Sequence, residues 1–231
     1  MNSYLLRRLF PFYILAVAAE FIFTVYSMAA ADSPLDMSFF GIVKTFGILL
    51  LTTTSAFLVM MIPYVAYLML LPQNWQNGRL DKYVSYFFYL VFAASTLGEE
   101  LLSAYFWQSQ GLPASLAAFR HSYNNPGVLV AGLLASPWLV WVCLAFFATL
   151  IVLMYYTARF TLTAIPAPKW LNRVFQTAVY AAVCVMTYLN INAETLMVST
   201  NDLNNELSEE GTYMVIKETV ADYAGGDFSK D

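Results

Sequence analysis

The sequence predicts an all-α membrane protein: a bundle of about five transmembrane helices followed by a juxtamembrane tail of amphipathic helices. Hydrophobic residues make up 60% of the 231 residues and charged residues only 11%, whereas soluble domains carry about 25% charged residues. Three stretches, 45–78, 121–158 and 174–193, contain no Asp, Glu, Lys or Arg. Because roughly 20 apolar residues cross a bilayer core, each stretch is long enough for a span.

Five spans can be placed, at about 9–31, 46–71, 83–104, 128–156 and 174–191. Pro63 and Pro137 lie in the second and fourth spans, where membrane helices tolerate proline. Both spans are long, so they are expected to be tilted or kinked or to extend past the bilayer. The first span also resembles a signal peptide, but its length and an internal Glu20 favour an uncleaved anchor. The domain organisation that we expect is a transmembrane domain over 1–191 and an extracytoplasmic linker over 192–231.

Basic residues in the short loops predict the orientation, because Lys and Arg favour the cytoplasmic side. An amino terminus inside leaves only Lys44 and Arg120 in outer loops and puts seven basic residues on the cytoplasmic side. Those seven are Arg7, Arg8, Arg79, Lys82, Arg159, Lys169 and Arg173. The carboxyl-terminal tail is then extracytoplasmic, and the expected location is a bacterial cytoplasmic (inner) membrane.

The tail is acidic, with nine Asp and Glu residues against two Lys residues in 192–231. Such a charge gives no electrostatic basis for binding nucleic acid, so we expect none as a partner. Its apolar residues recur at steps of three or four, which predicts short amphipathic helices on the membrane or against a further domain.

Glu20 is expected near the middle of the first span, where an ionisable side chain is by default a hypothesis for a functional site. The structural interpretation is a hydrogen-bonded carboxyl, with Thr52, Thr53 and Thr54 of the second span as possible partners. It is favoured over a proton relay because the sequence indicates no second carboxylate at a similar depth.

Glu99 and Glu100 are expected at the outer end of the third span, with Arg120 and His121 returning to the same leaflet before the fourth span begins. We therefore expect the two carboxylates to face Arg120 and His121 at the outer interface. This cluster is interpreted either as an interfacial salt bridge, which is favoured, or as a binding site for a lipid headgroup.

Catalytic motifs do not appear in the sequence. His121 is its one histidine, and a metal centre needs several convergent His, Cys, Asp or Glu ligands. There is also no phosphate-binding GxxxxGK loop. We therefore expect no catalytic residue and no cofactor in this chain.

Two segments carry a resemblance to a known family. The first is NNELSEEGTY at 204–213, followed by Asp227 and Phe228; the second is 99–129, which contains paired acids, an aromatic run at 105–107, Arg120-His121 and an Asn-Pro-Gly turn at 125–127. Together with the five spans they resemble the membrane domain of lipoteichoic-acid-synthase-like phosphotransferases, in the alkaline phosphatase and sulfatase superfamily. In this family, five membrane helices precede an extracytoplasmic catalytic domain.

The resemblance implies that this chain is the membrane anchor of such an enzyme and that it holds the lipid donor. The whole enzyme would transfer phosphoglycerol, phosphoethanolamine or a related group to a cell-envelope glycan or lipid. Its partners would be membrane phospholipids and the missing catalytic domain, in which a divalent metal, manganese, is expected. The alternative from another class is a self-standing membrane protein, such as a transporter subunit or complex partner, with Glu20 as its coupling acid.

Overall fold

The computed structural model describes residues 4–30, 38–110 and 168–190, with short helical pieces at 127, 130–131, 141, 144, 148, 216–217 and 219–220. Nearly all of these residues are helical and none of them lies in a strand, which confirms the all-α class for the described part of the chain. The long helices are α1 (Tyr4–Ala30), α2 (Phe39–Met60), α3 (Ile62–Leu70), α4 (Arg79–Gln110) and α8 (Trp170–Asn190).

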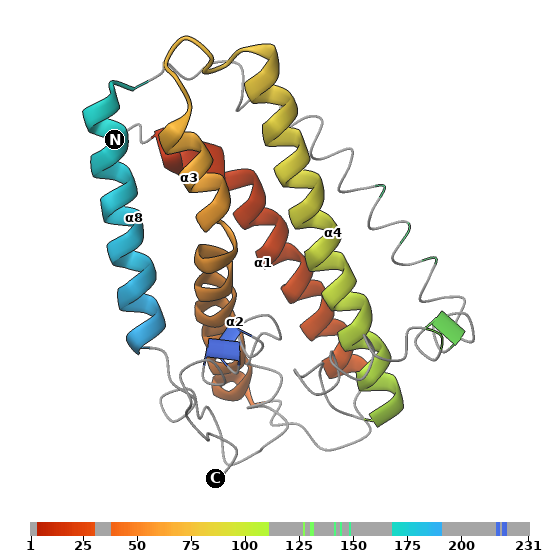
Figure 1. The fold of residues 1–231 in the computed structure, drawn as a ribbon. Coiled ribbons are helices and arrows are strands. Elements are labelled where there is room, and N and C mark those ends of the chain that lie inside the picture. Colours follow the sequence, from red (N-terminus) through yellow and green to blue (C-terminus); the bar gives the residue numbers. More distant parts are fainter. Residues whose placement is uncertain are drawn as a thin grey trace.

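The helices form a bundle in which α1, α4 and α8 run in one direction and α2 and α3 return in the other (Figure 1). Helix α1 packs against α4, α2 and α8, and α8 packs against α3 and α2. The first helix of the sequence is therefore in contact with most of the bundle, and its parallel partner α4 begins 75 residues after α1 begins.

A break separates α2 from α3 at Met61, two residues before Pro63. Proline lacks the backbone N–H that a helix interior needs, but it is tolerated in the first turn of a helix. The two helices stay stacked end to end, because the Met61 N–H still donates to Phe57 O (3.0 Å) and the Val65 N–H to Met61 O (2.9 Å). The second predicted span is thus formed by two helices that meet at Met61.

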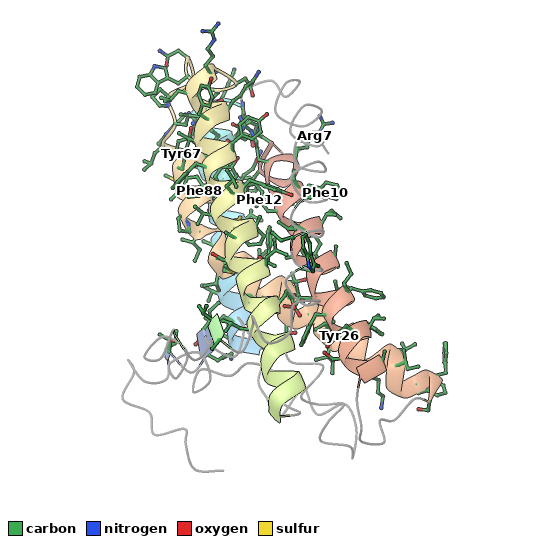
Figure 2. The ribbon with its side chains drawn as sticks, turned by 90° about the vertical axis from the view of Figure 1, so that its right-hand side faces the viewer. Arg7, Phe10, Phe12, Tyr26, Tyr67 and Phe88 are labelled. Carbon is green, nitrogen blue, oxygen red and sulfur yellow. The ribbon has the colours of Figure 1, made fainter. Side chains whose placement is uncertain are left out.

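Aromatic rings fill the space between α1, α2, α3 and α4. The ring centroid of Phe12 lies 5.0 Å from those of Tyr64 and Tyr89 and 5.7 Å from that of Phe92, while Phe57 contacts Phe92 at 5.9 Å. Phe12 points into the bundle, whereas Phe10, two residues earlier, points away from it (Figure 2). The packing of these rings sets the position of α1 relative to α4 along the helix axes.

Two described helices, α1 and α2, are long and apolar enough to cross a membrane. Large apolar side chains also lie exposed on the outer faces of the bundle, including Phe10 and Phe21 of α1 and Leu171 and Phe175 of α8. Extensive exposed apolar surface of this kind marks contact with lipid or protein. The predicted fourth span and the tail fall mostly outside the described residues.

Candidate functional site

Three carboxyl groups meet between α1 and α4. The side chain of Glu20, which is buried on α1, is hydrogen-bonded to Glu100 and lies within electrostatic range of Glu99, both on α4. Glu99 and Glu100 are themselves partly buried, and the Oε1 atom of each is shielded from solvent. The structure therefore brings Glu20 together with two of the predicted interface residues.

The aromatic cluster explains why these acids meet. Phe12 of α1 lies beside Phe92 of α4, and the two helices run in the same direction from there. Glu20 and Glu100 both follow this contact by eight residues, which is about 12 Å along each helix at 1.5 Å per residue. Positions separated by seven or eight residues lie on the same helix face, so the face that buries the phenylalanines also buries the acids.

A hydrogen bond between two carboxyl groups requires a proton. An ionised carboxylate only accepts hydrogen bonds, so a hydrogen bond between two carboxyl groups is donated by a protonated one. Like-charged carboxylates that share a site behave in this way, because one of them keeps its proton. The arrangement can hold a proton between two helices.

Hydroxyl groups continue this polar surface along both helices. On α1, Thr24 and Ser27 follow Glu20 by one and two turns; they are 1% and 0% exposed, and neither side-chain oxygen has a hydrogen-bond partner among the described residues. On α4, Thr96 and Ser103 are buried on either side of the acids. We call this set of seven residues the acidic seam: Glu20, Thr24, Ser27, Thr96, Glu99, Glu100 and Ser103.

The expected environment of Glu20 was wrong in two respects. Glu20 meets α4 rather than the threonines of α2, whose hydroxyls donate to carbonyls of their own helix: Thr52 and Thr53 to Leu49 O, and Thr54 to Leu50 O. Glu99 and Glu100 also supply carboxyl groups close to Glu20. They are on α4, and sequence spacing alone did not show that α4 lies beside α1.

Arg120 and His121 lie outside the described residues, so their predicted contact with Glu99 and Glu100 stays a prediction. Within the described part of the chain, the residue that Glu99 and Glu100 approach is Glu20 of α1.

A second polar cluster, at the amino-terminal end of α1, was missed by the sequence analysis. Arg8 forms a fully buried ion pair with Asp81 and donates to Tyr4 Oη (3.1 Å), Ser85 Oγ (3.2 Å) and Asn77 Oδ1 (3.3 Å). Arg8, which the sequence places among the basic residues of the cytoplasmic side, is buried inside the bundle. Asp81 could have indicated this cluster, because it is the one acidic residue in the basic loop between the second and third predicted spans.

Asp81 is held by further donors besides Arg8. The backbone N–H of Asn77 donates to Asp81 Oδ2 (2.8 Å), and Tyr67 Oη donates to Oδ1 (3.3 Å). Asn77 adopts a positive φ of 61°, a conformation that asparagine tolerates better than most residues. The α3–α4 turn therefore positions the Asp81 carboxylate so that it can pair with Arg8 of α1.

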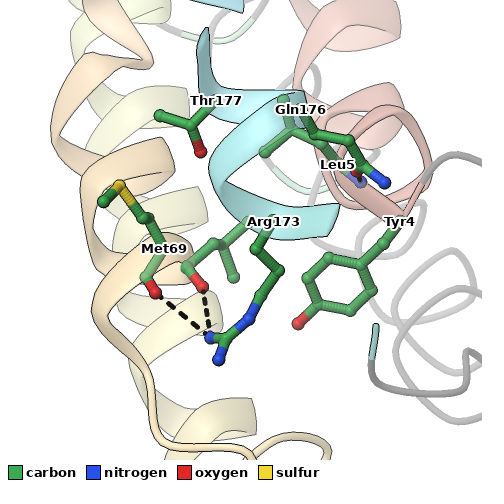
Figure 3. Close-up of a pocket in the computed structure, with 7 residues that line it drawn as sticks. Tyr4, Leu5, Met69, Arg173, Gln176 and Thr177 are labelled. Carbon is green, nitrogen blue, oxygen red and sulfur yellow. Dashed lines mark hydrogen bonds between the residues drawn. The ribbon is translucent and has the colours of Figure 1, made fainter. Parts of the chain in front are cut away.

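Arg173 joins α8 to the end of α3 (Figure 3). Its guanidinium donates to Leu68 O (3.2 Å), Met69 O (3.1 Å) and Leu71 O. These carbonyls lie at the carboxyl-terminal end of α3, where helix carbonyls have no partner within the helix and a cation is favourable. Beside it, Gln176 Oε1 accepts a hydrogen bond from the Leu5 N–H (3.1 Å), which links α8 to α1.

Lys217 contacts the opposite end of α8. Its ammonium donates to Tyr188 O (3.1 Å) and lies 4.6 Å from the centroid of the Tyr188 ring. Partial burial lowers the pKa of Lys217 below the ordinary value of lysine. A described part of the tail is therefore attached to the last turn of α8.

Among the described residues, no group of three or more His, Cys, Asp and Glu side chains is arranged to hold a metal ion. No protein-family model matches the chain, and no curated protein or solved structure matches it either.

Proposed function

We propose that this chain is a five-span bacterial membrane domain that anchors an extracytoplasmic phosphotransferase domain of the lipoteichoic-acid-synthase type and presents the lipid donor to it. The spans would be those predicted from the sequence, with the amino terminus in the cytoplasm and the tail outside. The donor and acceptor classes are those implied by the resemblance at 99–129 and 204–228.

The observation that supports this proposal is the uneven distribution of basic residues between the two ends of the bundle. Lys169 and Arg173 are at the start of α8, close to the ends of α1 and α4 that carry Arg7, Arg8 and Arg79. The end of α8, from which the acidic tail departs, is at the other end of the bundle, where Lys217 contacts Tyr188. Basic residues gathered at one end of a helix bundle favour the cytoplasmic side for that end, so the other end, where α8 finishes, would face outside.

Cysteine labelling tests this orientation. Single cysteines would be placed at Asn74, exposed in the α3–α4 loop, and at Ser208 of the tail, after Cys143 and Cys184 have been replaced by Ala. A membrane-impermeant maleimide should label position 208 on intact cells and position 74 only after permeabilisation. Labelling of position 74 from outside, with position 208 protected, would contradict the anchor proposal.

The gene sequence that follows Asp231 tests the phosphotransferase part. A continuation with a Thr nucleophile and clustered Asp and His ligands is expected. A stop codon or an unrelated domain would contradict it and would favour the alternative, a self-standing membrane protein such as a transporter subunit or complex partner.

A further inference from the structure

We propose that Arg173 of α8 and Tyr4 of α1 form a binding site for an oxygen of a phosphate group, and that the phosphate belongs to an anionic phospholipid. The site lies at the end of the bundle where α1 and α8 begin. The proposal does not rest on the phosphotransferase assignment, because it depends on contacts among α1, α3 and α8. Only the choice of a lipid over free phosphate uses the proposed membrane placement.

The guanidinium of Arg173 has a buried donor that the protein does not use. Its three hydrogen bonds to carbonyl oxygens of residues 68, 69 and 71 are all made by Nη1. Arg173 is 6% exposed, and its buried Nε has no hydrogen-bond partner. Guanidinium N–H groups form a fork that matches the oxygens of phosphate and carboxylate. Because a buried donor without an acceptor is costly, this atom favours the binding of an oxygen.

A small cavity lies at this donor and shows how large the bound group can be. It is lined by Tyr4, Leu5, Leu68, Met69, Arg173, Gln176 and Thr177 (Figure 3). The cavity is partly open, and its volume of about 10 Å³ is close to the smallest that holds one water molecule. A single oxygen atom fits this space, whereas a whole phosphate ion does not. We therefore expect the ligand to insert one oxygen and to keep its remaining atoms outside the bundle.

The hydroxyl of Tyr4 supplies a second donor to the cavity. Its oxygen accepts a hydrogen bond from Arg8 Nη2 (3.1 Å), and its hydrogen has no acceptor among the described residues. Tyr4 is 3% exposed, and its hydroxyl end points toward the Arg173 guanidinium (Figure 3). An oxygen in the cavity would therefore accept from both Arg173 Nε and Tyr4 Oη.

The charge at this end of the bundle favours an anion. Asp81 is the one carboxylate there in the described part of the chain, and it pairs with Arg8. Arg173 is bonded to carbonyl oxygens and to no described carboxylate. Further basic residues at this end are Arg7, Arg79, Lys82 and Lys169. Such an excess of positive charge attracts anions and, at the cytoplasmic face of a membrane, anionic lipids.

The surroundings of the cavity favour a phospholipid over free phosphate. Large exposed apolar side chains are next to its lining residues in the sequence: Leu70 follows Met69, and Phe175 precedes Gln176. Exposed apolar surface of this kind suits acyl chains. A phospholipid would place its phosphate at the cavity and its chains along α3 and α8, whereas free phosphate would make no use of this surface.

Thermal unfolding of the purified chain in detergent, titrated with dioleoyl phosphatidylglycerol, tests the site. The lipid should raise the unfolding midpoint of wild type. Tyr4→Phe removes one donor to a charged oxygen, so the apparent dissociation constant should rise about tenfold. Tyr67→Phe is the matched control, because the Tyr67 hydroxyl donates to Asp81 (3.3 Å) and Tyr67 does not line the cavity; it should bind the lipid as wild type does.

Arg173→Lys separates the fork from the charge. Lysine keeps the positive charge but has no planar set of N–H donors, so the affinity should again fall by about tenfold or more. Each shift is measured from the lipid-free midpoint of the same variant, so that a change in stability alone does not count. Equal affinity for the lipid in wild type and in either Tyr4→Phe or Arg173→Lys would overturn the proposal.

Two further probes identify the source of the oxygen. Dioleoylglycerol has the same acyl chains without a phosphate, and a shift as large as that with phosphatidylglycerol would overturn the proposal. A shift with sodium phosphate that is lost in Tyr4→Phe would support the oxyanion site but overturn the lipid as its ligand. The absence of a shift with both phosphatidylglycerol and sodium phosphate would overturn the site itself and leave the cavity to water.

Discussion

The guanidinium of Arg8 and the carboxylate of Asp81 form an ion pair from which water is excluded, because neither side chain has exposed surface. The two residues are 73 positions apart in the sequence. Their contact joins the second turn of α1 to the first turn of α4, and the surrounding donors and acceptors come from Tyr4, Asn77, Tyr67 and Ser85. The pair is therefore the polar counterpart of the aromatic cluster in the same interface, one turn before Phe12 on α1.

Breaking this pair should be strongly destabilising. Arg8→Ala leaves Asp81 as a buried, uncompensated charge, and losses of about 3–5 kcal/mol are typical in this situation. The free energy of unfolding in mixed detergent micelles measures the effect. Arg7→Ala is the matched control, because Arg7 is exposed on the same turn and exposed positions usually change stability by less than about 0.5 kcal/mol.

The double variant Arg8→Met with Asp81→Leu extends this test. Replacing both partners with apolar residues removes the buried charge, so it should recover much of the stability that Arg8→Ala loses. Equal losses for Arg7→Ala and Arg8→Ala would contradict the buried position of Arg8.

Removing the guanidinium of Arg173 should weaken the contact between α8 and α3. Arg173→Ala leaves three carbonyls at the end of α3 without this donor, and hydrogen bonds to charged groups contribute about 1.5–3 kcal/mol each at most. We expect a total loss of about 2 kcal/mol, since water can replace part of the bonding at this end. Lys169→Ala, at an exposed position before α8, should have little effect on the same unfolding curve.

Phe12 and Phe10 provide a paired test of the packing. Phe12→Ala removes a ring that contacts Tyr64, Tyr89 and Phe92, and such truncations cost about 3–5 kcal/mol. Phe10→Ala removes an identical side chain from the outer face, where 55% of Phe10 is exposed, and should cost less than about 1 kcal/mol. A larger loss for Phe10→Ala in thermal unfolding would mean that the inner face of α1 is wrongly assigned.

Lys217 should give the attachment of the tail a measurable pH dependence. Burial lowers the pKa of Lys217 in the folded chain, whereas an unfolded lysine titrates near 10.4. Between these two values the unfolded state binds more protons, so the contribution of Lys217 to stability rises with pH. The stability of wild type relative to Lys217→Met should therefore increase as pH approaches 10.4 from below. A decrease over this range would contradict the burial of the ammonium.

Much of the fold was predictable because apolar length and charge distribution determine where membrane helices form. The all-α class and the helical character of four of the five predicted spans agree with the structure for the described residues, and the second of these spans is divided at Met61. Helix ends differed: α4 begins at Arg79 and continues to Gln110, since charged and aromatic turns beyond the apolar stretch extend the same helix.

The pairing of helices was not predictable from composition. Glu20 could be recognised as a costly intramembrane acid, but its partners depend on which helix lies beside α1 and at what height. The relative axial position of the two helices is set by the contact between Phe12 and Phe92. Nothing in the local sequence distinguishes these two residues from the many other phenylalanines in apolar stretches. The burial of Arg8 was not predictable for the same reason, because a basic residue at a helix end fits both a membrane flank and a buried pair.

The parallel packing of α1 and α4 has a consequence for biosynthesis. When α1 leaves the ribosome, neither Asp81 nor Glu100 has been synthesised, so on the proposed membrane placement α1 would be inserted before the partners of Arg8 and Glu20 exist. Helix α1 can reach its final environment only after α4 has been inserted beside it. Membrane integration of the amino terminus should therefore remain provisional until roughly the first 110 residues are made, and a defect in α4 should appear as failed retention of α1.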